Sequence, residues 1–327
     1  MSHADAAPQL SRRMMLRCLG AAFAAGPLAS VLGCSSDAMN AGADAGADAL
    51  ADAGSDAALA DVTADVALTD AAAGAWATGG TAMIRGTLPN PFAGGAGTAC
   101  ALLCETTIGP CHTTSPMRQD VSDGVDGIPV RLALRVVDEQ CRPVANAIVE
   151  IWHTNSRGTY SGNINTMCNT TAADRAAMFF RGYLRTDADG RVDFNTCFPG
   201  WYSGRAIHIH VRVQTGDYAA ADNAASVVIT QLFFPEDVIQ GIFANVPLYS
   251  SRGQPDTPAA TDNVIGGTTD RARYTCDVQR TADGVMLASK TLIVRSSTSI
   301  ANCATQGSGM MMGGPGDGGM PPRPDGG

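Results

Sequence analysis

Apolar and polar residues alternate with a period of two over several short stretches of the chain. In the clearest stretch, residues 130–136, Val or Leu occupies every even position and Arg or Ala every odd one. Because the side chains of a strand point alternately to the two faces of a sheet, this pattern predicts a strand with one buried face. Weaker versions of the pattern predict further strands at residues 147–152, 191–194, 207–213, 227–234 and 290–295.

Turn signals separate these stretches. Asp-Ala-Asp-Gly at residues 187–190 and Ala-Asp-Gly at residues 282–284 are typical of tight turns between strands. The one stretch that favours a helix is short and covers residues 171–178. Many short strands with polar turns and few helical stretches predict a mainly β fold, and specifically a β-sandwich.

The strand pattern is confined to residues 81–305, and the flanking segments differ in composition. Residues 35–80 form an Ala/Asp-rich linker in which eight aspartates stand between Asp37 and Asp70 without any Lys or Arg. Most of them recur every four or five residues, which would place like charges on one face of a helix. We therefore predict a disordered, solvated tether, and a disordered Gly/Met/Pro-rich tail at residues 306–327.

The N-terminal residues 1–34 are interpreted as an export signal. Arg12 and Arg13 precede a largely apolar run that ends at Leu32 and is too short for a good membrane span. The segment resembles a twin-arginine signal, and Val-Leu-Gly-Cys at residues 31–34 resembles a bacterial lipobox. We therefore expect a periplasmic or cell-surface protein with a lipid anchor at Cys34. The alternative is a signal followed by an unmodified Cys34.

Charge and cysteine content narrow the classes of partner and compartment. The formal net charge of −9 comes mostly from the linker, and no basic cluster stands outside the N-terminus, so no nucleic-acid partner is predicted. A small neutral or anionic ligand fits this charge. An even number of cysteines in an exported chain favours disulfides over zinc, although the spacing leaves the pairing open. Beyond Cys18 and Cys34 these are Cys100, Cys104, Cys111, Cys141, Cys168, Cys197, Cys276 and Cys303.

A His-X-His pair lies inside one predicted strand. His208 and His210 are two residues apart in the alternating segment 207–213, so both imidazoles project from the same face of the sheet. Two neutral nitrogen atoms are thus placed to bind one metal ion. The pattern alone also fits histidines that are packed or hydrogen-bonded.

Two longer blocks give this pair a context. Residues 150–160 read Glu-Ile-Trp-His-Thr-Asn-Ser-Arg-Gly-Thr-Tyr, and residues 198–210 read Phe-Pro-Gly-Trp-Tyr-Ser-Gly-Arg-Ala-Ile-His-Ile-His. Both blocks resemble the intradiol ring-cleavage dioxygenases, and most closely an exported branch similar to protocatechuate 3,4-dioxygenase. The resemblance runs in the same order from Glu105 to Phe234. It implies a β-sandwich of the intradiol dioxygenase type.

The resemblance implies a mononuclear, non-haem Fe(III) held by Tyr160, Tyr202, His208 and His210. Phenolate oxygens stabilise the ferric state, and binding to the cation ionises a tyrosine whose free pKa is about 10. Tyr202 is the only tyrosine of its block. Some relatives carry tyrosine where Phe198 stands, and if that position holds the metal ligand, this chain lacks it.

The resemblance also implies roles for three pocket residues. Tyr202 would take a proton from the substrate, Arg205 would stabilise developing negative charge, and Gln231 would lie beside the substrate. Ordinary structural roles for Arg205 and Gln231, such as a salt bridge or a backbone hydrogen bond, remain open. His153 is interpreted as pocket lining or a structural donor, and His112 as a surface or structural residue.

The leading hypothesis is an enzyme that cleaves a catechol-type ring between its two hydroxylated carbons with O2. The alternative is an exported, non-catalytic β-sandwich that binds a glycan, a polymer or a protein. A third hypothesis, a His-X-His copper or zinc protein, leaves Tyr160 and Tyr202 unexplained. The sequence does not determine the ring substituents of the substrate or whether subunits pair.

Overall fold

The computed structural model describes residues 68–69, 75–95 and 100–305. The predicted signal, nearly all of the predicted linker and the predicted tail lie outside these residues. Trp76 packs against the core, and the backbone N–H of Ala77 donates to Gly284 O at 2.9 Å. The last residues of the predicted linker, before residue 81, therefore already pack against the folded domain. No helix in the described ranges is long and apolar enough to cross a membrane.

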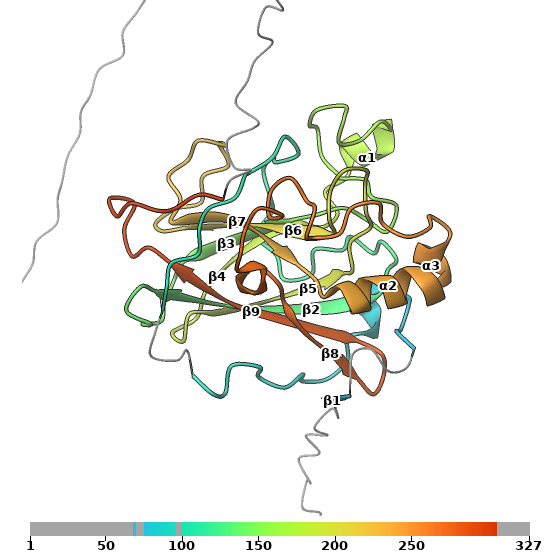
Figure 1. The fold of residues 1–327 in the computed structure, drawn as a ribbon, viewed down its shortest axis with the longest axis horizontal. Coiled ribbons are helices and arrows are strands. Elements are labelled where there is room, and N and C mark those ends of the chain that lie inside the picture. The colour runs from blue at the N-terminus through green and yellow to red at the C-terminus, as the bar shows by residue number, and fades with distance from the viewer. Residues whose placement is uncertain (1–67, 70–74, 96–99, 306–327) are drawn as a thin grey trace, which may run out of the picture. The chain divides into compact units, whose positions relative to one another are not determined.

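Two β-sheets form the domain (Figure 1). The order of one sheet is β1-β8-β9-β2-β5, and the order of the other is β4-β3-β6-β7. Neighbouring strands run antiparallel except β2 and β9, which are parallel. The strands are β1 (Leu68–Thr69), β2 (Pro129–Asp138), β3 (Ile148–Trp152), β4 (Arg181–Arg185), β5 (Arg191–Cys197), β6 (His208–Gln214), β7 (Val228–Phe233), β8 (Asp277–Thr281) and β9 (Met286–Val294).

Alternating side chains from both sheets form the main core. The even-numbered residues 130–136 of β2, Val149 and Ile151 of β3, and the odd-numbered residues 209–213 of β6 are all buried in it. Each such Val, Leu or Ile stabilises the fold by roughly 1.5–3 kcal/mol when it is fully buried. The alternating pattern thus brings the inner faces of the two sheets together, and the predicted mainly β sandwich is confirmed.

The outer face of the four-stranded sheet is also covered, and it carries polar side chains. Trp152 of β3 pairs in register with His210 of β6, which in turn pairs with Gln231 of β7. Directly paired residues of neighbouring strands point to the same face. All three side chains are buried, so the loops that connect the strands cover this face. These loops give the face an environment that is separate from the sandwich core.

The prediction of helices was too restrictive. Helix α1 (Ala172–Ala176) falls inside the predicted stretch, but α2 (Glu236–Asn245) and α3 (Pro247–Ser250) were not predicted. In α2 the apolar residues Val238, Ile239, Ile242 and Phe243 occupy one helical face and are buried. That spacing is a helical signal, which the run of apolar residues in the preceding strand obscured. Two 3-10 helices, η1 (Gly80–Met83) and η2 (Arg271–Arg273), complete the elements described.

Strands β1, β4 and β8 also escaped prediction. Strand β1 lies within the linker that was predicted to be disordered, and it pairs with β8. In β4 the buried residues are Arg181 and Gly182, so no apolar alternation marks the strand. In β8 most side chains are exposed or half-buried and polar. Both strands form because a neighbouring strand supplies backbone partners, which the local sequence does not reveal.

Six of the eight expected cysteines form disulfides. The pairs are Cys100–Cys141, Cys104–Cys303 and Cys111–Cys168. Cys197 and Cys276 are free and buried in the core. Burial raises the pKa of each of these thiols to about 12, so both stay protonated and act as small apolar side chains.

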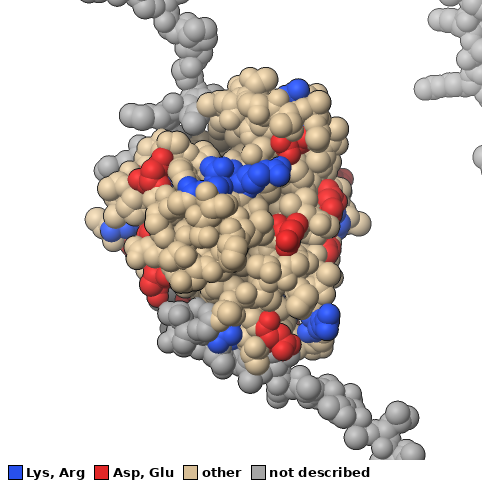
Figure 2. All heavy atoms as spheres, turned by 90° about the vertical axis from the view of Figure 1, so that its right-hand side faces the viewer, with Lys and Arg blue, Asp and Glu red and all other residues tan. Residues whose placement is uncertain are grey.

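Charged residues are dispersed over the face that Figure 2 shows. Some of the Lys and Arg side chains form one short band, the other Lys and Arg and the Asp and Glu side chains are scattered, and most of the surface is uncharged. This face therefore presents no extended surface of one charge sign.

Candidate metal centre

The two histidines of β6 project together onto the outer face of the four-stranded sheet. Their Nε2 atoms are 3.1 Å apart. His208 Nδ1 lies 2.6 Å from the carbonyl oxygen of Ala206, which can only accept, so Nδ1 carries the proton and Nε2 keeps its lone pair. Burial lowers the pKa of His208 to about 3 and also lowers the pKa of His210. Both imidazoles are therefore neutral near pH 7 and available as nitrogen ligands.

Two tyrosines from separate loops reach the same point. The hydroxyl of Tyr160 lies 3.4 Å from His208 Nε2, and the hydroxyl of Tyr202 lies 3.3 Å from it. Tyr160 stands in the loop after β3, and Tyr202 stands in the loop before β6. Burial raises the pKa of both phenols, so without a nearby cation both would be neutral near pH 7.

The donor set fits a hard metal cation. A neutral imidazole nitrogen has one lone pair, so His208 Nε2 can accept from only one of its three polar neighbours. A cation among the four atoms would use lone pairs from all of them and would favour ionised phenols, which opposes the effect of burial. Phenolate oxygen with imidazole nitrogen suits Fe(III). Among the described residues, no three His, Cys, Asp or Glu side chains lie close enough together to hold one metal ion. This candidate site therefore depends on its tyrosines.

Close packing between two loops sets the spacing of the tyrosines. Asn155 N donates to Thr159 O at 3.0 Å and closes the loop that leads to Tyr160. Gly158 has a φ of +76°, and a Cβ added there would stand 1.9 Å from the carbonyl oxygen of Trp201. The two blocks that resemble the dioxygenases therefore pack directly on each other at a point where only glycine fits.

The His210 ring is held from two sides. The Trp152 ring stacks on it with centroids 4.8 Å apart and planes only 8° from parallel. The loop at Gly109 packs against the His210 ring so closely that a Cβ added to Gly109 would lie 3.1 Å from His210 Cε1. Within the described structure His210 Nδ1 has no hydrogen-bond partner, so packing rather than a second hydrogen bond fixes this ring.

Arg205 is positioned by a residue that sequence reasoning missed. The carboxylate of Asp262 accepts from Arg205 Nε at 2.9 Å and from the backbone N–H groups of Ala206 at 2.8 Å and Val264 at 2.9 Å. Arg205 Nη2 also donates to Gln231 Oε1, and Gln231 Nε2 donates to Thr107 O at 3.0 Å. Asp262 lies 57 residues after Arg205 in a loop without repeated pattern, so no local signal marked it.

A cavity opens beside these side chains. It has a volume of about 630 Å³ and is lined by Tyr202, Arg205 and His210 together with residues of the loops at 107–111, 167 and 263–264. Tyr160 is only 2% exposed and is absent from the lining. Of the two tyrosines, therefore, only Tyr202 faces the cavity.

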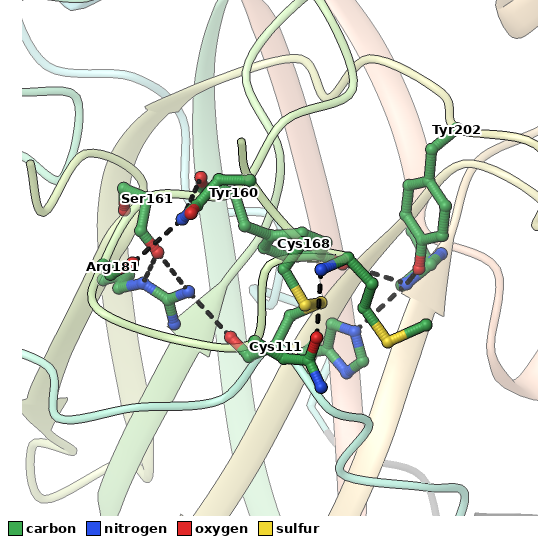
Figure 3. The surroundings of a disulfide bond; sticks show 12 residues. Cys111, Tyr160, Ser161, Cys168, Arg181 and Tyr202 are labelled. Atoms are coloured by element: carbon green, nitrogen blue, oxygen red, sulfur yellow. Dashed lines mark hydrogen bonds between the residues drawn. A yellow bond between two sulfur atoms is a disulfide. The ribbon is translucent and has the colours of Figure 1, made fainter. Parts of the chain in front are cut away.

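The disulfide Cys111–Cys168 joins the cavity wall to the loop after Tyr160 (Figure 3). Figure 3 shows the bridge next to the Tyr160 ring, with Arg181 and Ser161 on one side and Tyr202 on the other. Tyr160 N donates to Cys168 O at 3.2 Å, and Arg181 Nη2 donates to Cys111 O at 2.7 Å. The sequence predicted that these cysteines form disulfides but left their pairing open.

The other candidate residues from the sequence lie outside the group formed by Tyr160, Tyr202, His208 and His210. His153 is buried, and its two ring nitrogens lie 2.8 Å from Thr154 O and 2.7 Å from Thr196 Oγ1. Burial lowers the pKa of His153 to about 4, and the residue is a structural one. His112 is buried rather than on the surface, and bonds to Glu150 at 3.2 Å and Asp222 at 2.6 Å.

Phe198 does not face the site. Its ring packs in the sandwich core, 4.7 Å from Phe234 and 5.8 Å from Tyr249 between centroids. The structure thus brings together Tyr160, Tyr202, Arg205, His208, His210 and Gln231, while their chemical roles stay predictions.

Comparison with known proteins places this site in a family. The family model described as Dioxygenase matches residues 109–273, about half of the chain. The chain is 33% identical over 138 residues to the protocatechuate 3,4-dioxygenase beta chain of Burkholderia cepacia, covering 40% of this chain and 52% of that one. It is 36% identical over 84 residues to catechol 1,2-dioxygenase 2 of Acinetobacter lwoffii, covering 25% and 28%.

A solved structure has the same fold. The intradiol ring-cleavage dioxygenase from Tetranychus urticae superposes with a TM-score of 0.50 at 26% identity, covering 60% of this chain and 95% of that one. The chain therefore belongs to the intradiol ring-cleavage dioxygenase family. It spans only about half, or less, of the length of the two curated relatives named above.

Proposed function

We propose that this protein is a dioxygenase that binds one non-haem Fe(III) through Tyr160, Tyr202, His208 and His210. Its substrate is a catechol-type aromatic, whose ring it cleaves with O2 between the two hydroxylated carbons. The observation that carries this proposal is the convergence of two tyrosine hydroxyls and two neutral imidazoles at the edge of a cavity. Bound Fe(III) would supply Lewis-acid binding of the two substrate oxygens and would activate the electron-rich ring towards O2.

Tyr202 is the residue suited to take a substrate proton. It lines the cavity, whereas Tyr160 is buried behind it. A phenolate oxygen at Tyr202 can accept the proton of a substrate hydroxyl, so the site contains its own base. Tyr160, without access to the cavity, remains a fixed ligand.

Arg205 supplies positive charge beside the reacting ring. Its ion pair with Asp262 and its hydrogen bond to Gln231 hold the guanidinium before substrate arrives. Such a fixed donor stabilises negative charge that develops on the ring without reorganising during the reaction. The same hydrogen bond keeps Gln231, the register partner of His210, in one orientation.

Metal content, colour and oxygen incorporation test this proposal together. We expect the purified protein to contain one iron per chain, to be red-brown from tyrosinate-to-Fe(III) charge transfer, and to place both atoms of ¹⁸O2 into the ring-opened diacid formed from catechol. A colourless protein that stays iron-free and inactive after iron loading would contradict it. The alternative of a non-catalytic binding module predicts no oxygen uptake, and a copper or zinc site predicts stoichiometric copper or zinc.

We propose further that the domain is exported by the twin-arginine route and anchored through a lipid on Cys34. Three disulfides support an oxidising compartment. Replacing Arg12 and Arg13 with lysine should keep the protein in the cytoplasm, and Cys34→Ala should release it from the membrane fraction. Membrane association that survives Cys34→Ala would contradict the anchor.

A further inference from the structure

The cavity beside the candidate metal centre contains very little net charge. Among the described residues that line it, Arg205 is the only one with a charged side chain. The carboxylate of Asp262, itself fully buried, lies 2.9 Å from Arg205 Nε and balances that charge. A substrate therefore meets a cationic group whose charge is already paired.

The remaining lining is neutral. Thr107, Ser203 and Asn263 are polar but uncharged, whereas Pro110, Met167 and Val264 are apolar. Met167 is 70% exposed, which is unusual for a large apolar side chain and places it at the rim of the cavity. The wall that a ring substituent would contact thus combines apolar surface with neutral hydrogen-bonding groups.

The size of the cavity exceeds what a single ring needs. Its volume of about 630 Å³ lies within the range that holds drug-sized ligands. Catechol, with eight non-hydrogen atoms, would occupy only part of this space. The remainder of the cavity, whose lining includes Met167 and Val264, is available to a substituent on the ring.

We propose that the site selects catechols with an uncharged, extended ring substituent over catechols with a ring carboxylate, and that Met167 contacts the substituent. The proposal rests on the proposed function and specifies its substrate class. A carboxylate placed in the cavity would lose water without gaining an unpaired cation, because Asp262 already offsets the positive charge of Arg205. A neutral substituent would instead bury apolar surface against the rim.

A matched pair of substrates tests the selection. 3,4-Dihydroxybenzoate and its methyl ester share the catechol ring and differ in the charge of the substituent. We expect kcat/KM for the ester to exceed that for the acid by at least about tenfold at pH 7, where the acid is ionised. Equal values, or a preference for the acid, would overturn the proposal. Catechol serves as the reference, because failure to cleave catechol, the acid and the ester would contradict the proposed function instead.

A positive charge introduced at the rim tests the role of Met167. Met167→Lys should raise the acid-to-ester ratio of kcat/KM by about tenfold, because it supplies the missing cation. Met117→Lys is the matched control, since Met117 is a methionine with 66% exposure that does not line the cavity. An unchanged ratio in Met167→Lys, or an equal rise in Met117→Lys, would overturn the assignment of Met167.

Truncation gives an independent measure of the same contact. Met167→Ala should lower the ester-to-catechol ratio of kcat/KM by about fivefold, because less apolar surface is buried against the substituent. A ratio that does not change would show that the substituent lies elsewhere and would overturn the proposed contact.

Discussion

Tyr160 and Tyr202 have the same side chain but different surroundings. Both hydroxyls lie within 3.4 Å of His208 Nε2, yet only Tyr202 lines the cavity. The Tyr160 ring packs with Cys111, Trp152 and Cys168 in a small apolar cluster. In the proposed function, this difference in access makes Tyr160 the fixed ligand and Tyr202 the proton acceptor.

Removing the Tyr160 hydroxyl should weaken metal binding. We expect Tyr160→Phe to lower iron affinity by at least about tenfold, because one oxygen ligand is lost while the ring still fills its site. Iron per chain and the visible charge-transfer band measure the effect. Tyr183→Phe is the control, since Tyr183 stacks on Tyr218 away from the cluster. Unchanged iron content in Tyr160→Phe would remove this residue from the site.

Asp262 gives a second prediction at the residue scale. Its carboxylate pairs with Arg205 and accepts hydrogen bonds from the backbone N–H groups of Ala206 and Val264. Asp262→Asn should lower kcat/KM for catechol by about tenfold to a hundredfold with iron content retained, since Arg205 loses its charged partner but the ligands stay in place. Asp270→Asn, which changes a more exposed carboxylate near Arg273, is the control. Full activity of Asp262→Asn would show that Arg205 needs no such support.

At the scale of elements, β6 carries two environments on one strand. Its odd-numbered residues 209–213 enter the sandwich core, while His208, His210 and Arg212 project to the other face. Arg212 pairs with Glu150 of β3 at 2.7 Å, so this face contains a buried ion pair on the same strand as the candidate metal ligands His208 and His210. The strand therefore cannot slip by one residue without moving Arg212 and the two histidines into the apolar core and apolar side chains onto the polar face.

The loops are held to this strand by a disulfide, which gives a third prediction. Cys111–Cys168 spans 57 residues and Cys111 lines the cavity, whereas Cys100–Cys141 spans 41 residues and neither of its cysteines lines the cavity. Replacing either pair with serine should cost about 4 kcal/mol of unfolding free energy, because loops of similar length are released in the unfolded chain.

The two disulfide variants should differ in iron binding. We expect only the Cys111/Cys168 variant to lose iron and activity, because that bridge holds both the cavity wall and the loop after Tyr160. Denaturant unfolding and iron content, measured on both variants, separate the general effect from the local one. Equal iron retention in both would show that this bridge stabilises the fold without positioning the site.

At the scale of the whole molecule, the buried charges predict how stability depends on pH. Burial by itself would raise the pKa of Glu150, but hydrogen bonding to His112 and the charges of His112 and Arg212 outweigh it, so that the pKa is lowered. A carboxyl group with a lowered folded pKa stabilises the protein above its unfolded pKa of about 4.3. That contribution is lost as the pH falls through the lower folded value.

We therefore expect the free energy of unfolding to decrease as the pH falls below about 5, and to decrease less steeply in Glu150→Gln. The variant should also be less stable at pH 7 by about 3–5 kcal/mol, because Arg212 is left buried without its partner. Urea unfolding across the pH range measures both effects. Asp217→Asn, which changes a fully exposed carboxylate, should leave the slope unchanged. If the unfolding free energy of Glu150→Gln depended on pH as steeply as that of the unchanged protein, other groups would cause the acid sensitivity.

Local periodicity determined what could be predicted from the sequence. The alternation at residues 130–136 and 207–213 identified β2 and β6, and it placed His208 and His210 on one face, because side-chain direction in a strand depends only on position. Tyr160, Tyr202, Arg205 and Gln231 were identified by family resemblance. The same local reasoning missed β4, which lacks apolar alternation and depends on its neighbouring strand. It also missed α2, whose helical spacing follows directly on an apolar strand.

Only the tertiary structure decided which distant segments meet. Asp262 reaches Arg205 across 57 residues, Cys111 pairs with Cys168, and Phe198 turns into the core while Tyr202 turns to the cavity. These outcomes depend on loop paths, which close packing and buried hydrogen bonds select among many conformations of similar local energy. The sequence by itself thus determined the faces of the strands and the types of donor atoms. Folding decided their distances and their access to the cavity.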